Sequence, residues 1–339
     1  MIRINFAAVS FWYQGRIMFT RSFKNGSTFL RLGAFNAGGF SIFSAVIRQL
    51  AAVLLLLCAA NGYARPDMTP LGPNIADKGS AFYHFTVNTF DSADGKRHYK
   101  VWTAIPNKKP PASGYPVLYL LDGNAVMDRL SDDLLQKLSL RDPPVLVAIG
   151  YQTALPFDLT ARAYDYTPAT QSSPQNLRGR TGGGSAVFRT LLEHTIAPQA
   201  EKDLAIDPQK RALWGHSYGG LFVLESFLSS DFFHTFYSAV PSLDRHNAAL
   251  LNALEQVDEA QGSQKSLWFM EGDGDRKARD ENATSDVLNA VSQTVSRLRS
   301  RGISATYRLY PGLTHGAMFA ASMRLALLDI SGETLAEAQ

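Results

Sequence analysis

Five short, nearly continuous apolar segments constrain the fold of this chain more than any other feature of its sequence. They cover residues 115–123, 144–151, 210–217, 236–242 and 265–273. Strands that are buried on both faces of a parallel sheet have this composition, whereas strands with one face in water alternate between apolar and polar residues. Helical stretches separate the segments, and strands that alternate with helices are typical of α/β domains. The sequence therefore predicts an α/β fold with a mostly parallel, doubly wound sheet.

Further strand and helix signals lie at both ends of this pattern. Residues 81–90 and 98–106 flank an Asp-Gly turn and predict an antiparallel N-terminal hairpin, and residues 306–312 predict a last strand. Helices are expected at 127–139, 186–204, 219–230, 286–302 and 317–332. No break in composition divides residues 81–335, so we expect them to form a single domain.

Two stretches lack a core pattern. Residues 65–80 are polar and rich in proline, which predicts an extended and loosely held N-terminal segment. Residues at about 152–185 run without regular periodicity, and a loop of that length in a compact domain is usually functional or disordered. Its aromatic and arginine side chains favour a substrate-facing insertion, although its Ser/Gly-rich end leaves disorder open.

Residues 1–64 are typical of a leader with a signal peptide. Arg48 precedes an apolar h-region at about 50–60, and small residues at Gly62 and Ala64 follow it, which is the order of a secretory signal. The apolar run has about 11 residues, whereas a membrane-spanning helix needs about 20. We expect cleavage after Ala64, a periplasmic protein and no stable membrane insertion; an uncleaved anchor is the alternative.

Charge and cysteine usage exclude several functions. The leader contains six of the 33 basic residues and none of the 30 acidic ones, so the rest of the chain carries 27 basic against 30 acidic residues. A nucleic-acid partner is not expected, because binding would need clustered lysine and arginine. The single cysteine, Cys58, lies in the h-region, so the mature protein would have neither a disulfide nor a cysteine metal site.

The sequence GHSYG at residues 215–219 places Ser217 between two glycines, after a predicted strand and before a predicted helix. This context is that of a nucleophile elbow, in which a sharp turn exposes the serine at the carboxyl ends of the strands. Side chains at Gly215 and Gly219 would be expected to collide with the adjoining strand and helix. A helix-capping serine is the simpler reading, and it does not explain the flanking glycines.

A serine hydroxyl needs a base. His315 follows the last predicted strand, which is where this fold places its histidine. Asp275, after the strand at 265–273, is our candidate for the acid that orients the imidazole, and Asp273 is the alternative. A Ser-His dyad with no acid partner also remains open.

Acyl transfer needs hydrogen-bond donors for the oxyanion. The backbone N–H of Tyr218, which follows the nucleophile, is one candidate. The loop after the strand at 115–121 is the other source, since Gly123 allows close backbone approach and the N–H of Asn124 follows it.

A family resemblance rests on five segments of the chain. YPVLYLLDGNAVMDRL, PPVLVAIGYQT, LPFDLTARAYDYTP, GHSYGGLFVLESFLSS and THGAMFAASMRLALLDISGE resemble the esterase D-type α/β-hydrolases, and more narrowly periplasmic siderophore esterases that cut enterobactin-type trilactones. The resemblance covers about residues 80–335. It implies an α/β-hydrolase fold and hydrolysis of the ester bonds of a tricatecholate siderophore, free or iron-loaded, with no cofactor or metal of the enzyme's own. It matches the catalytic pair to Ser217 and His315 and leaves a third, acidic member in doubt.

A catecholate iron complex carries several negative charges, and arginine suits planar anionic groups. Arg162 and Arg180, both in the insertion, are the candidates for contacting it. The alternatives to a siderophore esterase are a general carboxylesterase or thioesterase of the same fold, and a noncatalytic binder of ferric siderophore.

Overall fold

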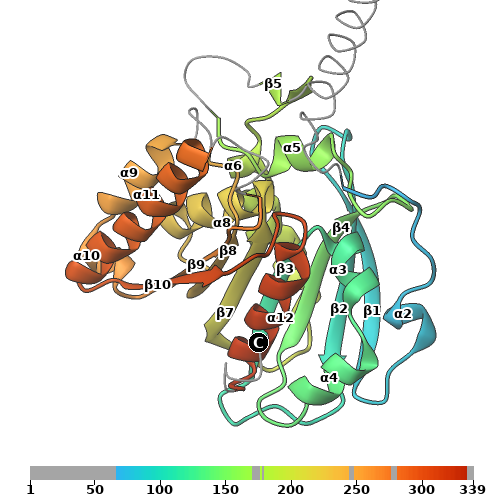
Figure 1. The fold of residues 1–339 in the computed structure, drawn as a ribbon. Helices are drawn as coiled ribbons and strands as arrows, with labels where there is room; N and C mark the ends of the chain where they lie inside the picture. The colour runs from blue at the N-terminus through green and yellow to red at the C-terminus, as the bar shows by residue number, and fades with distance from the viewer. Residues whose placement is uncertain (1–65, 170–175, 178, 244–247, 276–280, 334–339) are drawn as a thin grey trace, which may run out of the picture. The chain divides into compact units, whose positions relative to one another are not determined.

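An eight-stranded sheet organises the protein, with the strand order β1-β2-β4-β3-β7-β8-β9-β10 (Figure 1). The strands are β1 (Tyr83–Asp91), β2 (His98–Pro106), β3 (Tyr115–Leu121), β4 (Val145–Tyr151), β7 (Ile206–His216), β8 (Thr235–Ala239), β9 (Ser266–Gly272) and β10 (Ser304–Tyr310). All neighbours from β4 to β10 are parallel, whereas β2 is antiparallel to both β1 and β4. The predicted parallel sheet with an antiparallel N-terminal hairpin is confirmed.

This computed structural model describes residues 66–169, 176–177, 179–243, 248–275 and 281–333. The predicted leader and its cleavage site after Ala64 lie outside these residues. All described residues belong to one compact unit, Gly62–Gln339. No helix in the described ranges has both the length and the apolar content to cross a membrane.

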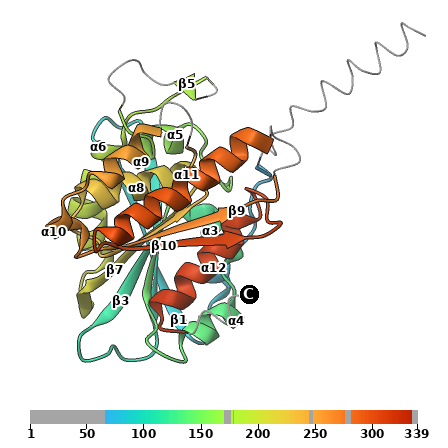
Figure 2. The same ribbon diagram turned by 60° about the vertical axis from the view of Figure 1, so that its left-hand side comes forward.

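Helices cover both faces of the sheet. On one face lie α3 (Gly123–Arg129), α4 (Asp132–Leu138) and α12 (Met318–Ile330). On the other lie α6 (Ser185–Leu191), the π-helical turn η3 (Leu192–Ile196), α7 (Ala197–Ala200), α8 (Tyr218–Ser229), α9 (Ala248–Glu255) and α11 (Glu281–Ser300), with α10 (Glu259–Gly262) following α9. Figure 2 shows α11 and α12 on opposite sides of β10.

The central strands supply both halves of the core. Along β3, Val117 and Tyr119 pack with the α8 side, whereas Leu118 and Leu120 pack with the α12 side. Side chains alternate between the faces of a strand, so a strand with helices on both faces must be apolar throughout. All seven residues of β3 are buried, which explains the continuous apolar segments of the sequence.

The expected helix at 127–139 is instead two helices, α3 and α4. The hydroxyl of Ser131 accepts a hydrogen bond from the Leu134 N–H (3.3 Å), so this serine caps α4 and starts a new helix. Serine followed by Asp132 and Asp133 is a helix-start signal. The break ends α3 at Arg129, after about two turns.

The two stretches without a core pattern are both more ordered than expected. The insertion contains a short helix, α5 (Ala161–Asp165), and a hairpin of β5 (Asn176–Leu177) and β6 (Arg180–Thr181). The N-terminal segment forms α2 (Ile75–Lys78), whose start has reciprocal capping bonds between Asn74 and Asp77. Residues 66–74 before this helix have no regular secondary structure.

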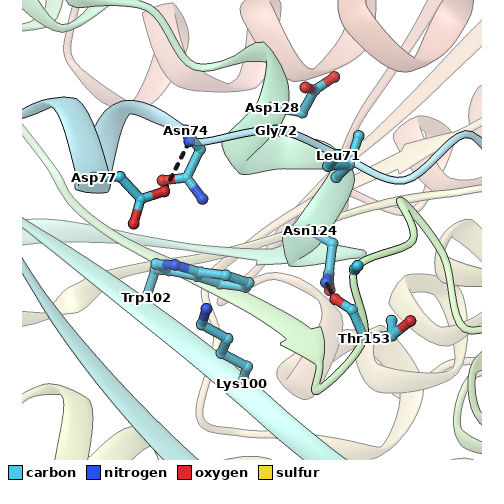
Figure 3. Close-up of a pocket in the computed structure, with 10 residues that line it drawn as sticks. Leu71, Gly72, Asn74, Asp77, Lys100, Trp102, Asn124, Asp128 and Thr153 are labelled. Atoms are coloured by element: carbon cyan, nitrogen blue, oxygen red, sulfur yellow. Dashed lines mark hydrogen bonds between the residues drawn. The ribbon is translucent and has the colours of Figure 1, made fainter.

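The N-terminal segment lies beside α3 and β2 around a small cavity of about 140 Å³ (Figure 3). The Leu71 N–H donates to the Ala154 carbonyl at 2.8 Å, which ties this segment to the start of the insertion. Trp102 and Asn124 line the same cavity. The segment therefore supports the element that carries one candidate oxyanion donor.

Candidate active site

Ser217 occupies a strained turn between β7 and α8. Its backbone has φ 61° and ψ −113°, a conformation that residues other than glycine rarely adopt. Such strain persists only where the surrounding structure imposes it, and it is common at catalytic residues. The turn leaves Ser217 partly exposed at the carboxyl end of β7, while Gly215 and His216 before it are buried.

The glycines around Ser217 differ in whether a side chain would fit at their positions. A Cβ at Gly215 would lie 2.3 Å from the Gly219 carbonyl oxygen, so only glycine fits there. A Cβ at Gly219 would lie 3.4 Å from its nearest neighbour, Leu121 Cδ1, which is an ordinary contact. A Cβ at Gly220 would lie 2.9 Å from the Ala239 carbonyl oxygen. The expected collision is thus present at Gly215, but it was wrong for Gly219 and belongs to Gly220 instead.

A second strained residue, Val240, brings another hydroxyl close to Ser217. Val240, just after β8, has φ 34°, and its N–H donates to the Met270 carbonyl at 2.8 Å. The chain then turns so that the Ser242 N–H donates to the Ser217 carbonyl at 3.2 Å. The two serine hydroxyls lie 2.9 Å apart (Oγ to Oγ). Ser242 was not singled out from the sequence.

His315 lies in the loop between β10 and α12, beside the elbow. Its ring centroid is 4.8 Å from that of His216, the residue before Ser217. His216 Nε2 lies 2.8 Å from the His315 carbonyl oxygen. A carbonyl can only accept, so Nε2 carries the proton of the His216 ring. Burial, followed by the charge of His315, lowers the pKa of His216 well below its usual value, so this ring is neutral and positions the His315 backbone.

Asp275 and Asp273 hold the backbone of the histidine loop. An Asp275 carboxylate oxygen accepts the His315 backbone N–H at 2.6 Å, and Asp273 accepts the Gly312 N–H at 2.6 Å. A Cβ at Gly274 would lie 2.4 Å from the Gly312 carbonyl oxygen, so glycine permits this close approach of two loops. This contact of Asp275 is with the His315 main chain, and the predicted role of Asp275 in orienting the imidazole stays a prediction.

The two candidate oxyanion donors begin neighbouring helices. Strands β3 and β7 are parallel neighbours, with Leu120 opposite Trp214, so the starts of α3 and α8 lie side by side. Tyr218 is the first residue of α8 and Asn124 the second of α3, and N–H groups there have no intrahelical acceptor. Both helix ends also favour negative charge.

The Asn124 side chain fixes the start of α3 to the end of β4. Its Nδ2 donates to the carbonyls of Tyr151 (3.0 Å) and Thr153 (2.9 Å), and its Oδ1 accepts the Tyr151 N–H (2.8 Å). A Cβ at Gly123 would lie 2.7 Å from the Gly150 nitrogen, so the two backbones touch. The side chain of Asn124 is thus held by both its amide nitrogen and its oxygen, and Figure 3 shows its contact with Thr153.

The two arginines of the insertion differ in position. Arg162, on α5, is 6% exposed and its guanidinium forms a bidentate pair with the Asp122 carboxylate at 2.8 and 2.8 Å. Contact between Arg162 and substrate stays a prediction. Arg180 lies in β6, half-buried and opposite Leu177. Its contact with substrate stays a prediction.

The sequence analysis did not single out Asp122 or Ser242. Asp122 directly precedes Gly123, so its position at the end of a buried strand was a signal that could have been used. Ser242 follows a proline after a buried strand, and its approach to Ser217 depends on the Val240 backbone, which no sequence pattern indicates. No cluster of three or more potential metal ligands occurs among the described residues.

The sheet topology and the strained strand-to-helix turn define the class: the protein is an α/β-hydrolase. The family model described as "Putative esterase" matches residues 92–330, and the chain belongs to this esterase family.

Two curated relatives and one solved structure are similar over most of this chain. It is 57% identical over 284 residues to the apo-salmochelin esterase of Escherichia coli O6:H1, covering 83% of this chain and 89% of that one. It is 30% identical over 244 residues to the ferri-bacillibactin esterase BesA of Bacillus subtilis, covering 68% and 83%. The solved structure of the enterobactin hydrolase IroE in complex with DFP, a serine-hydrolase inhibitor, is 57% identical, with a TM-score of 0.71, and covers 77% of this chain and all of that chain.

Proposed function

We propose that this protein is a serine esterase that hydrolyses the ester bonds of a tricatecholate trilactone siderophore through an acyl-enzyme. The observation that carries the proposal is the strained Ser217 turn, which presents a hydroxyl between the starts of α3 and α8 and beside the His315 loop. The relatives named as apo-salmochelin and ferri-bacillibactin esterases, and the IroE structure named as an enterobactin hydrolase, support the substrate class.

In the proposed mechanism, the Ser217 hydroxyl attacks the ester carbonyl while the His315 imidazole takes its proton. The backbone N–H groups of Tyr218 and Asn124 stabilise the oxyanion of the tetrahedral intermediate. His315 then returns the proton to the leaving alcohol, which gives an acyl-enzyme. Water, activated by the same imidazole, releases the acid and regenerates Ser217.

The described contacts support a role for Asp275 at the His315 main chain. Asp275 and His216 hold the His315 backbone from its N–H and its carbonyl. These bonds fix the loop that carries the imidazole. We therefore propose that Asp275 contributes to catalysis by anchoring the loop that carries the His315 imidazole.

We also propose that the protein is exported to the periplasm. The order of Arg48, an apolar run and small residues up to Ala64 supports a cleaved signal. Hydrolysis there would meet the siderophore outside the cytoplasm, free or iron-loaded. Arg180 is the candidate insertion residue for contact with the anionic catecholate groups.

The test compares three substrates with the purified protein from residue 65 onward. Enterobactin, its ferric complex and p-nitrophenyl butyrate are incubated separately, and products are followed by liquid chromatography and absorbance. We expect cleavage of the trilactone at a kcat/KM well above that for the small ester. A strong preference for p-nitrophenyl butyrate, with intact trilactone, would instead indicate a general carboxylesterase.

The matched control is Ser217→Ala in the same assays. The variant should lose hydrolysis of every ester and keep its fold by circular dichroism. Ferric-siderophore binding without hydrolysis by the wild-type protein, unaffected by this substitution, would indicate a binder.

A further inference from the structure

A buried ion pair joins the insertion to the two loops that carry the candidate oxyanion donors. Arg162 on α5 donates from Nε to Asp122 Oδ1 and from Nη2 to Asp122 Oδ2, both at 2.8 Å. The same Nη2 lies 3.4 Å from the carbonyl oxygen of His216. The two side chains are 8% and 1% exposed. One guanidinium therefore contacts the residue before α3 and the residue before Ser217.

Asp122 forms this ion pair and does not cap its own helix, α3. It is the residue before α3, where an aspartate commonly caps its own helix, yet its side chain makes no capping bond. Its backbone has φ 56° and ψ 46°, and its N–H donates to the Tyr166 hydroxyl at 3.2 Å. This strained conformation directs the carboxylate to Arg162 and leaves the first N–H groups of α3 without a side-chain acceptor.

The arginine also touches the nucleophile side of the site. Its guanidinium carbon lies 5.3 Å from the ring centroid of Tyr218 and 5.5 Å from that of Tyr166. Tyr218 follows Ser217 and carries the other candidate donor. The guanidinium thus contacts both halves of the oxyanion site.

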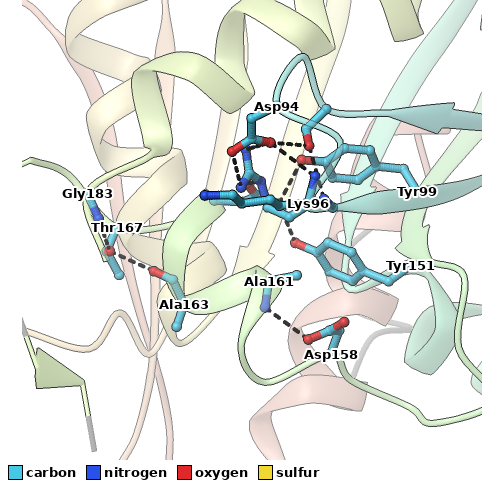
Figure 4. Close-up of polar contacts among 12 residues, drawn as sticks. Asp94, Lys96, Tyr99, Tyr151, Asp158, Ala161, Ala163, Thr167 and Gly183 are labelled. Atoms are coloured by element: carbon cyan, nitrogen blue, oxygen red, sulfur yellow. Dashed lines mark hydrogen bonds and ion pairs between the residues drawn. The ribbon is translucent and has the colours of Figure 1, made fainter. Parts of the chain in front are cut away.

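Helix α5 is itself firmly held, as Figure 4 shows. Asp158 accepts the Ala161 N–H at 2.9 Å at the start of the helix. At its end, the hydroxyls of Tyr99 and Tyr151 donate to Asp165 at 3.0 Å each, and Arg97 Nε lies 2.9 Å from the other oxygen of that carboxylate. These contacts fix the backbone from which Arg162 extends.

We propose that Arg162 is a positioning residue that sets the distance between the Asn124 and Tyr218 N–H groups, and that it does not contact the siderophore. A buried ion pair rarely adds net stability compared with apolar side chains of the same volume, so fold stability alone does not account for it. A role in holding the Asn124 and Tyr218 N–H groups at a fixed distance does account for the pair, because misplaced oxyanion donors slow the reaction strongly. The inference rests on the proposed esterase mechanism.

The test measures kcat and KM of Arg162→Gln with two substrates that differ in size and charge. A residue that positions the oxyanion donors affects every ester, so kcat should fall by about 10- to 100-fold for both enterobactin and p-nitrophenyl butyrate. KM should stay within about threefold for both, because ground-state contacts are unchanged. Phosphorylation by DFP should slow by a similar factor, since it also builds charge on an oxygen at this site.

Asp122→Asn and the double variant complete a thermodynamic cycle. Because the two residues act as one unit, the double variant should lose no more kcat than the worse single variant. Arg162→Lys keeps the charge but not the bidentate geometry, so it should fall between wild type and Arg162→Gln. This variant also avoids an unpaired buried carboxylate, so it stays informative if Arg162→Gln unfolds.

Arg211→Gln is the matched control. Arg211 forms a similar bidentate pair with Glu201, at 2.8 and 2.6 Å, on the same strand as the elbow but about 20 Å from it at 3.3 Å per residue. The kcat of Arg211→Gln should equal that of wild type for both esters. A raised KM for enterobactin with unchanged turnover of p-nitrophenyl butyrate would assign Arg162 to substrate contact and overturn the inference, as would an unchanged kcat for both. If the wild-type protein cleaves only the small ester, the proposed substrate is refuted. The role of the Arg162–Asp122 pair can then still be tested with p-nitrophenyl butyrate.

Discussion

Gly215 and Gly219 flank Ser217 symmetrically in sequence, and the structure predicts opposite results when each is changed to alanine. At Gly215 the new Cβ would lie 2.3 Å from the Gly219 carbonyl oxygen and 2.5 Å from its carbon. Carbon–oxygen contacts are normally at least about 3.3 Å, so the turn must open by about 1 Å. Backbone atoms on both sides of the contact leave no flexible side chain to move aside. The start of α8 and the Ser217 hydroxyl must shift instead.

A displacement of about 1 Å at a catalytic group costs about 100-fold in rate. Overpacking of this kind also costs about 1–3 kcal/mol of stability. Gly215→Ala should therefore lose about 100-fold in kcat, with a lowered melting temperature. Gly219→Ala meets only Leu121 Cδ1 at 3.4 Å and replaces a helical glycine, so its stability should stay equal or rise by up to about 1 kcal/mol.

The assay is kcat with p-nitrophenyl butyrate for both variants, with thermal unfolding followed by circular dichroism. The ratio of the two kcat values is the decisive quantity, because both substitutions add one methyl group within two residues of Ser217. Equal losses in the two variants, or a Gly215→Ala enzyme as active as wild type, would refute the reasoning from backbone contact.

Two further predictions concern stability. Asn124→Ala removes three hydrogen bonds and leaves the buried Tyr151 N–H without its acceptor, so urea unfolding should show a loss of about 1–3 kcal/mol; wild-type stability would contradict it. Burial raises the pKa of Glu271 to about 8, so the folded state keeps a proton that the unfolded state releases above its usual pKa of 4.5. Wild-type stability should therefore fall as pH rises from about 4.5 to 8, by at most about 1.4 kcal/mol per pH unit. Glu271→Gln stays neutral at every pH, so its free energy of unfolding should rise relative to that of wild type between pH 4.5 and about 8. A difference between the two proteins that does not change with pH would contradict this prediction.

The sheet could be predicted from the sequence because each central strand is a short, continuous apolar segment. Strand β3 is buried at all seven residues, and a short apolar run between polar turns is typical of a strand with helices on both faces. The elbow was predicted for a similar reason, since the tight contact at Gly215 lies within five residues of chain. The break between α3 and α4 had a local signal in Ser131, and the apolar positions on both sides of it masked that signal.

The features that the sequence did not show depend on contacts between distant residues. Arg162 and Asp122 are 40 residues apart, and only the folded chain shows that the arginine is buried in an ion pair. Asp275 was predicted beside His315, and its bond to the His315 backbone N–H depends on a loop geometry that the sequence does not show. Ser242 reaches Ser217 through the strained Val240, and strain of this kind leaves no pattern in a single sequence.

The central claim is that Ser217 is the nucleophile, and covalent labelling tests it most directly. The protein is treated with DFP, and the modified residue is located by intact-mass measurement and peptide mapping. The account predicts one diisopropylphosphoryl group on Ser217, loss of ester hydrolysis in proportion to labelling, and no adduct in Ser217→Ala. An adduct on another residue that abolishes hydrolysis, or full hydrolysis by Ser217→Ala, would contradict it.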